Sequence, residues 1–146
     1  MTNRLVIADS SALVSLSSIT DRNHRLAISL SNQLTGTNRQ LVIPGDVFAE
    51  TINTLGKKVS HNMAFGTASE ILNSDSSIIT EANPTIRQNA LDKFQNQTES
   101  VSYTNCIVMA FADEYETREI FGFDNVFRKN GYIRLGIDKN KTKSPN

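Results

Sequence analysis

The chain has 146 residues, of which 38% are hydrophobic and 21% are charged, a size and composition typical of one soluble globular domain. Its 15 basic and 15 acidic side chains cancel, which excludes a strong overall field that would draw the protein to nucleic acid or to a membrane. The single cysteine excludes an internal disulfide, and no apolar run approaches the roughly 18 residues of a membrane span.

Short apolar runs alternate with amphipathic segments along the chain. The first run, LVIA (5–8), predicts a buried strand. Asp9 interrupts this apolar start too early for a secretory signal, so we expect a cytoplasmic protein. Further strands are predicted at 40–44, 76–80 and 119–123, with a short edge strand at 132–135. Helices are predicted after Asp9, over 24–34, from Gly45 to Gly56, after Ser60, after Pro84 and over 102–114.

This alternation of strands and helices is typical of an α/β fold. The strand runs are apolar throughout, so both faces of the sheet should be covered. We therefore predict a mainly parallel sheet of four to five strands with helices on both faces. One domain is expected over residues 1–137, followed by a mobile polar tail over 138–146, which has no apolar anchor.

Several acidic or polar residues stand where strands end or helices begin. Asp9 follows the first strand and Asp124 follows EIFGF (119–123), while Glu50 and Asn105 lie on predicted helices. Sites in open parallel sheets lie beyond the carboxyl ends of the strands. Carboxylates gathered there favour a hard cation such as Mg²⁺ or Mn²⁺, which can activate a water for attack on a phosphodiester.

Each of these residues taken alone also has a purely structural explanation. An Asp after a strand is usually a helix cap, and so is an Asn at a helix start, while an acid within a helix usually faces solvent. The sequence contains no glycine-rich phosphate loop and no Cys/His cluster. The residues by themselves thus predict an α/β domain with a carboxylate site and go no further.

Four segments in order resemble the PIN domain, a small metal-dependent nuclease fold found in toxins of toxin–antitoxin pairs and in RNA-processing factors. The segments are VIADSSALVSL, VFAETINTL, SYTNCIVMAFADE and IFGFDNVFRKNGYIRL. The resemblance spans about residues 4–135 and implies a three-layer α/β/α arrangement. Each segment is weakly specific alone, but four in the right order are fairly specific.

The resemblance implies roles for individual residues. The implied catalytic set is Asp9, Glu50, Asn105 and Asp124, of which Asp9, Asn105 and Asp124 would hold the metal. Ser10, Ser102 and Thr104 would support this set. Asn105 stands where the family usually has Asp, and Gly122 where a Ser or Thr is common. The site therefore loses one formal negative charge and one hydroxyl, and we expect it to bind one metal ion with intact or reduced activity.

The segment from Arg118 onward carries seven basic residues against three acids. Arg128 and Lys129 lie nearest to Asp124 and are the predicted RNA-binding residues. The resulting hypothesis is a metal-dependent ribonuclease, and the resemblance further implies a toxin with an antitoxin partner and homodimerisation. The alternative is a catalytically silent PIN module that binds RNA or a protein. A non-nuclease phosphohydrolase is a third hypothesis, disfavoured by the lack of a phosphate loop.

Overall fold

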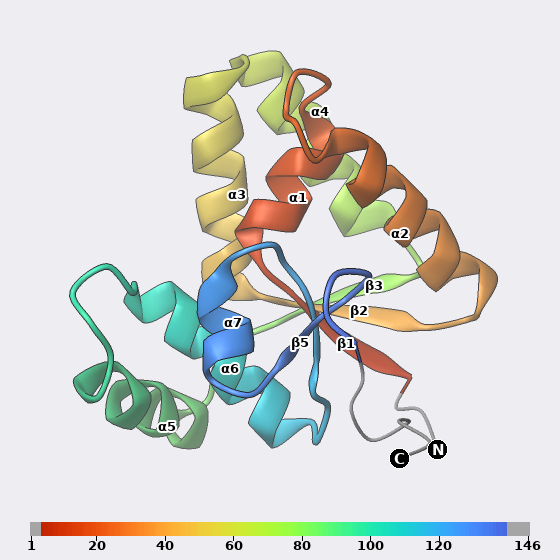
Figure 1. The fold of residues 1–146 in the computed structure, drawn as a ribbon. Coiled ribbons are helices and arrows are strands. Elements are labelled where there is room, and N and C mark those ends of the chain that lie inside the picture. Colours follow the sequence, from red (N-terminus) through yellow and green to blue (C-terminus); the bar gives the residue numbers. More distant parts are fainter. Residues whose placement is uncertain (1–3, 140–146) are drawn as a thin grey trace.

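A computed structural model describes residues 4–139 and shows a five-stranded sheet in the order β3-β2-β1-β4-β5 (Figure 1). Every neighbouring pair of strands is parallel. This confirms the predicted parallel sheet, including the short fifth strand at its edge. The strands are β1 (Leu5–Ala8), β2 (Gln40–Pro44), β3 (Ser77–Thr80), β4 (Glu119–Phe121) and β5 (Ile133–Arg134).

Helices cover both faces of this sheet, which confirms the three-layer arrangement. Helices α1, α2 and α4 lie over one face and α5 and α6 over the other, while α3 packs against α1 and α4 (Figure 1). The short α7 contacts α6 and β5. The helices are α1 (Ser10–Ser17), α2 (His24–Gly36), α3 (Gly45–Lys58), α4 (His61–Asn73), α5 (Pro84–Gln95), α6 (Tyr103–Glu114) and α7 (Asn125–Lys129).

Strand β1 is the centre of the core, because Val6, Ile7 and Ala8 are fully buried. The chain continues from β1 to β2 and β3 on one side and later returns to β4 and β5 on the other. The carboxyl ends of β1 and β4 thus flank the point where the strand order reverses, the usual place for a ligand in an open parallel sheet. The backbone N–H of Asp9 donates to the carbonyl of Phe121 at 2.9 Å, which aligns the two strand ends.

Helix α3 is longer than predicted. Gly56 was expected to end it, but the helix continues to Lys58. The reason is tertiary: Leu55 is fully buried, and its carbonyl accepts the backbone N–H of Val59 at 2.9 Å. This packing outweighs the roughly 1 kcal/mol that a glycine costs within a helix. The extra residues place Lys57 and Lys58 on α3.

The polar tail predicted over 138–146 lies mostly outside the described residues. Asp138, its first residue, is anchored: Nε and Nη2 of Arg134 donate to its two carboxylate oxygens at 2.9 and 3.0 Å. This contact ties residue 138 to the end of β5. Among residues 4–139, no helix has the length and apolar character needed to cross a bilayer.

Candidate active site

An open cleft of about 390 Å³ lies at the carboxyl ends of β1 and β4. It brings together the four residues of the predicted catalytic set from β1, α3, α6 and the start of α7. The predicted Asp9, Glu50, Asn105 and Asp124 all line this cleft. Its other lining residues are Ser10, Ser11, Val14, Ser15, Asp21, Asn23, Thr54, Lys58, Ser102 and Phe123.

Asp9 is the most buried acid of the cleft, with 2% of its surface exposed. It caps α1, and its Oδ2 accepts the backbone N–H of Ser11 at 3.1 Å and the Ser11 hydroxyl at 2.6 Å. The Ser11 Oγ in turn accepts the backbone N–H of Phe123 at 3.0 Å. One hydroxyl therefore links the first acid to the segment that carries the last acid, Asp124.

The sequence resemblance implied that Ser10 supports the catalytic set, but in the structure it is Ser11 that contacts Asp9. A signal for Ser11 was present, because the side chain of a helix-capping residue bonds to the backbone two or three positions later. The residue two positions after an acidic cap is thus within reach of its carboxylate. Ser10 lines the cleft but makes no side-chain hydrogen bond within the part of the chain that the structure describes.

Gly122 lies directly against Asp9. A Cβ at position 122 would come within 2.8 Å of the Asp9 Cβ and 3.1 Å of Cε2 of Phe127. A Ser or Thr here would therefore have to displace its neighbours. The hydroxyl that Gly122 lacks is supplied next to Asp9 by Ser11 instead.

The environment raises the pKa of Asp9 to about 6. The largest cause is burial, which disfavours the charged form. The hydrogen bonds from Ser11 partly oppose it by stabilising the carboxylate, and the negative charges of Glu50 and Asp124 raise the pKa further. Both carboxylates are therefore close enough to Asp9 to disfavour its charge, and a cation placed beside Asp9 would be stabilised.

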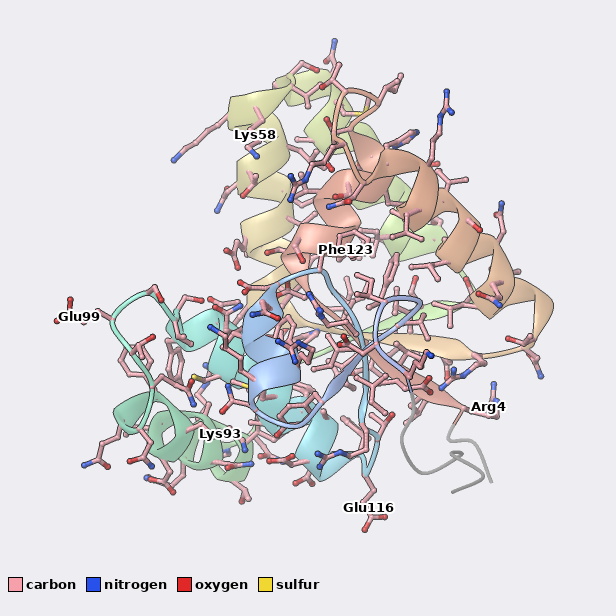
Figure 2. The ribbon with its side chains drawn as sticks, viewed as in Figure 1. Arg4, Lys58, Lys93, Glu99, Glu116 and Phe123 are labelled. Carbon is pink, nitrogen blue, oxygen red and sulfur yellow. The ribbon has the colours of Figure 1, made fainter. Side chains whose placement is uncertain are left out.

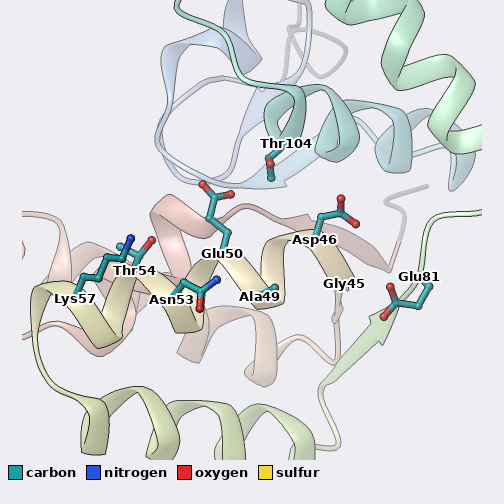
Figure 3. A pocket seen from close by; sticks show the side chains of 9 residues that line it. All are labelled: Gly45, Asp46, Ala49, Glu50, Asn53, Thr54, Lys57, Glu81 and Thr104. Atoms are coloured by element: carbon teal, nitrogen blue, oxygen red, sulfur yellow. The ribbon is translucent and has the colours of Figure 1, made fainter.

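Glu50 and Asp124 are more open to solvent than Asp9. Asp124 caps α7, where its Oδ1 accepts the backbone N–H of Val126 at 3.1 Å. Glu50 projects from α3 toward Thr104 of α6 (Figure 3). Within residues 4–139 the Glu50 carboxylate has no hydrogen bond or ion pair, so both of its oxygens are free to meet a ligand.

Asn105 is engaged in capping α6. Its Oδ1 accepts the backbone N–H of Ser102 at 3.1 Å and the Ser102 hydroxyl at 3.0 Å, while its own N–H donates to Ser102 Oγ at 3.0 Å. Because a backbone N–H can only donate, the acceptor must be the amide oxygen. Both lone pairs of that oxygen are therefore used in the helix cap, and ligation of a metal by Asn105 would compete with the cap.

The donor atoms of the cleft suit a hard cation by their chemistry, although they are not preassembled as a cage. Within residues 4–139, no three His, Cys, Asp or Glu side chains form a ready-made metal cluster. Asp9 Oδ1, Asp124 Oδ2 and both oxygens of Glu50 nevertheless have no protein partner in that range. Mg²⁺ is commonly held by one or two carboxylates, several waters and substrate phosphates, an arrangement these residues fit.

The remaining predicted residues divide between this cleft and its surroundings. Ser102 lines the cleft, whereas Thr104 lines a neighbouring one together with Glu50. Arg128 and Lys129 are exposed on α7 and line neither of these clefts, and Arg128 Nε donates to Asn125 Oδ1 at 3.1 Å. The base that does line the cleft with the acids is Lys58, which lies near the end of α3 (Figure 2).

Comparison with known proteins gives a structural likeness without a sequence match. No family model matches the chain, and no curated protein matches it. Among solved structures, the crystal structure of the Sarcin-Ricin loop cleaving toxin VapC20 of Mycobacterium tuberculosis superimposes with a TM-score of 0.78 at 17% sequence identity. The match covers 89% of this chain and 98% of the toxin chain. The chain therefore shares the fold of this toxin, which confirms the PIN-type α/β fold that its four sequence segments implied.

Proposed function

We propose that the protein is a metal-dependent endoribonuclease that hydrolyses RNA phosphodiester bonds. The observation that carries this proposal is the convergence of Asp9, Glu50 and Asp124, from distant parts of the chain, on one open cleft at the switch point of the sheet. The structurally similar VapC20 is a toxin that cleaves the Sarcin-Ricin loop, which supports RNA as the substrate class.

Asp9 and Asp124 would hold a divalent cation, with Glu50 facing it across the cleft. When bound, the cation would supply Lewis-acid chemistry, stabilising charge on phosphoryl oxygens and making water more acidic. Ser11 fixes the orientation of Asp9. Glu50 has an uncommitted carboxylate, which can accept the proton of the attacking water. Asn105, whose oxygen is used in the cap, retains amide N–H groups that can donate to a phosphate oxygen.

The direct test is cleavage of mixed RNA by pure protein with Mn²⁺, with and without EDTA. We expect cleavage that EDTA abolishes and that Asp9→Asn slows by about 100-fold or more, since even residues that only orient metal ligands are worth about 10–100-fold. Equal cleavage by the two proteins would remove Asp9 from the mechanism.

A second candidate function is a catalytically silent module that binds RNA or a protein. Two observations favour it: the amide oxygen of Asn105 is committed to the helix cap, and residues 4–139 contain no ready-made metal cluster. Calorimetric titration with Mn²⁺ separates the two functions. A saturable site that disappears in Asp9→Asn supports the enzyme, whereas no metal uptake together with RNA binding supports the silent module.

The sequence resemblance also motivates a proposed biological role as the toxin of a toxin–antitoxin pair, acting in the cytoplasm as a homodimer. The structural likeness to a toxin supports this role. Its test is induced expression in a bacterial host. Growth arrest that Asp9→Asn relieves would support the role, whereas unimpaired growth with confirmed expression of active protein would count against it.

A further inference from the structure

Helix α3 forms a ridge between two clefts. On one side is the cleft of the acids, and on the other lies a second open cleft of about 590 Å³ between α3, the end of β3 and the start of α6 (Figure 3). The two clefts share Glu50 and Thr54. Glu50 therefore stands where a ligand occupying both clefts would cross the helix.

The helical period distributes the side chains of α3 between the two clefts. Asn53 and Lys57, three and seven positions after Glu50, line the second cleft. Thr54 and Lys58, four and eight positions after Glu50, line the cleft of the acids. At about 1.5 Å of rise per residue, the lysine Cα atoms lie about 10–12 Å along the axis from Glu50, within reach of a phosphate next to the reacting one.

Each cleft is lined by a single basic residue: Lys57 in one and Lys58 in the other. Neither lysine side chain makes a hydrogen bond or ion pair within residues 4–139. Four other basic side chains of the described residues are committed to ion pairs. They form the pairs Arg39–Glu119, Arg87–Asp46, Lys93–Asp113 and Arg134–Asp138. The basic side chains that line these two clefts therefore both come from the last turn of α3.

We propose that single-stranded RNA crosses α3 at Glu50, with Lys58 and Lys57 binding the phosphates on the two sides of the reacting phosphodiester. This inference rests on the proposed ribonuclease function and adds the path of its substrate. A nucleic-acid duplex is too stiff to bend over one helix, so the strand that occupies both clefts is single. The contacts are to phosphates, so they hold the strand without reading its sequence.

The test measures binding separately from cleavage. Fluorescence anisotropy of a short fluorescein-labelled oligouridine, in EDTA, gives the dissociation constant at several salt concentrations. The variants are Lys57→Gln, Lys58→Gln, their double variant, Arg128→Gln, Lys129→Gln and Arg25→Gln. Arg25 is an exposed base on α2 that lines neither cleft, so its replacement is the charge-matched control.

For a single strand, each lost phosphate contact reduces the salt slope of log K by about 0.7. We therefore expect each lysine variant to reduce the slope by about 0.7 and the double variant by about 1.4, with Arg25→Gln unchanged. The proposal is overturned if the wild-type protein does not bind the probe, or if the lysine variants bind it with the wild-type salt slope. It is also overturned if Arg25→Gln reduces the salt slope as much as a lysine variant does. It also falls if only Arg128→Gln or Lys129→Gln weakens binding, which would put the strand along α7.

Failure of this path and failure of the proposed function give different results. RNA binding that depends on the lysines, without Mn²⁺-dependent cleavage, supports the proposed path of the RNA and contradicts the proposed ribonuclease function. Cleavage that depends on Asp9, together with RNA binding that is unchanged in both lysine variants, supports the ribonuclease function and contradicts the proposed path of the RNA.

Discussion

Gly122 lies so close to Asp9 that a Cβ at position 122 would stand 2.8 Å from the Asp9 Cβ. From the sequence, this glycine looked like the loss of a useful hydroxyl. In the folded chain it allows the end of β4 to pack against the buried acid, and Ser11 provides the hydroxyl contact to Asp9. Asp9 therefore meets a hydroxyl from Ser11 on one side and the bare backbone of Gly122 on the other.

Gly122→Ala should be destabilising and should impair the site. The added methyl group meets atoms closer than ordinary van der Waals contact, and overpacking of this kind costs about 1–3 kcal/mol. It should also displace Asp9 and weaken Mn²⁺ binding. Urea denaturation and metal titration measure the two effects.

Gly66→Ala is the matched control for this substitution. A Cβ at Gly66 meets no atom within 4 Å, and the residue lies inside α4. Alanine should therefore stabilise the protein by up to about 1 kcal/mol through its helix propensity. Equal stability of Gly122→Ala and wild type would show that the strand end relaxes without cost.

Ser11→Ala should reduce stability and RNA cleavage more than Ser10→Ala does. The change removes the hydroxyl bond to Asp9 and leaves the Phe123 N–H without its acceptor, at a cost of about 1–3 kcal/mol. Loss of an orienting bond should slow cleavage about 10–100-fold. Thermal melts and cleavage rates of the two variants measure this, and a larger effect at Ser10 would contradict the structural assignment.

Asp9→Asn should stabilise the metal-free protein at neutral pH. Burial raises the pKa of Asp9 from 3.8 to about 6, so between these values the folded state binds more protons than the unfolded state. Stability should therefore fall as pH rises through this window, by about 3 kcal/mol in total. Asn carries no charge and avoids this loss.

Urea midpoints in EDTA measure this difference. The urea midpoint of the variant should exceed that of wild type at about pH 7. The two midpoints should converge at about pH 3, below both pKa values, where Asp9 is protonated in the folded and the unfolded state. A constant difference across this range would mean that Asp9 does not titrate as an isolated buried acid.

Asn105→Asp should strengthen metal binding without loss of the helix cap. A carboxylate has two acceptor oxygens, so one can keep the bonds to Ser102 while the other faces the cleft. A negative charge in the first turn of α6 is also favourable by about 0.3–1 kcal/mol. We expect tighter Mn²⁺ binding by calorimetry and faster RNA cleavage.

Asn105→Ala is the control, because it removes the capping contact and the amide together. It should destabilise the protein by about 1 kcal/mol. If Asn105→Asp changes neither metal affinity nor cleavage, residue 105 either lies outside the reacting centre or is already fully competent as Asn.

Much of the architecture could be predicted because local patterns and tertiary packing agree. The apolar run LVIA predicts a buried strand, and that strand is the fully buried centre of the sheet. The end of α3 could not be predicted in the same way. Gly56 is a local signal to stop, and the buried Leu55 against α1 and α4 overrides it.

The succession of strands and helices along the chain and the acids at their ends could be predicted, because both depend on residue type and spacing. The departure at position 105 came from the resemblance to the PIN domain. The folded chain was needed to show which hydroxyl contacts Asp9, that position 122 has no room for a Cβ and that Lys58 shares a cleft with the acids. The packing around Asp9 brings together residues that are far apart in the chain. Ser11 and Phe123 are 112 positions apart, and nothing local in either segment specifies the other.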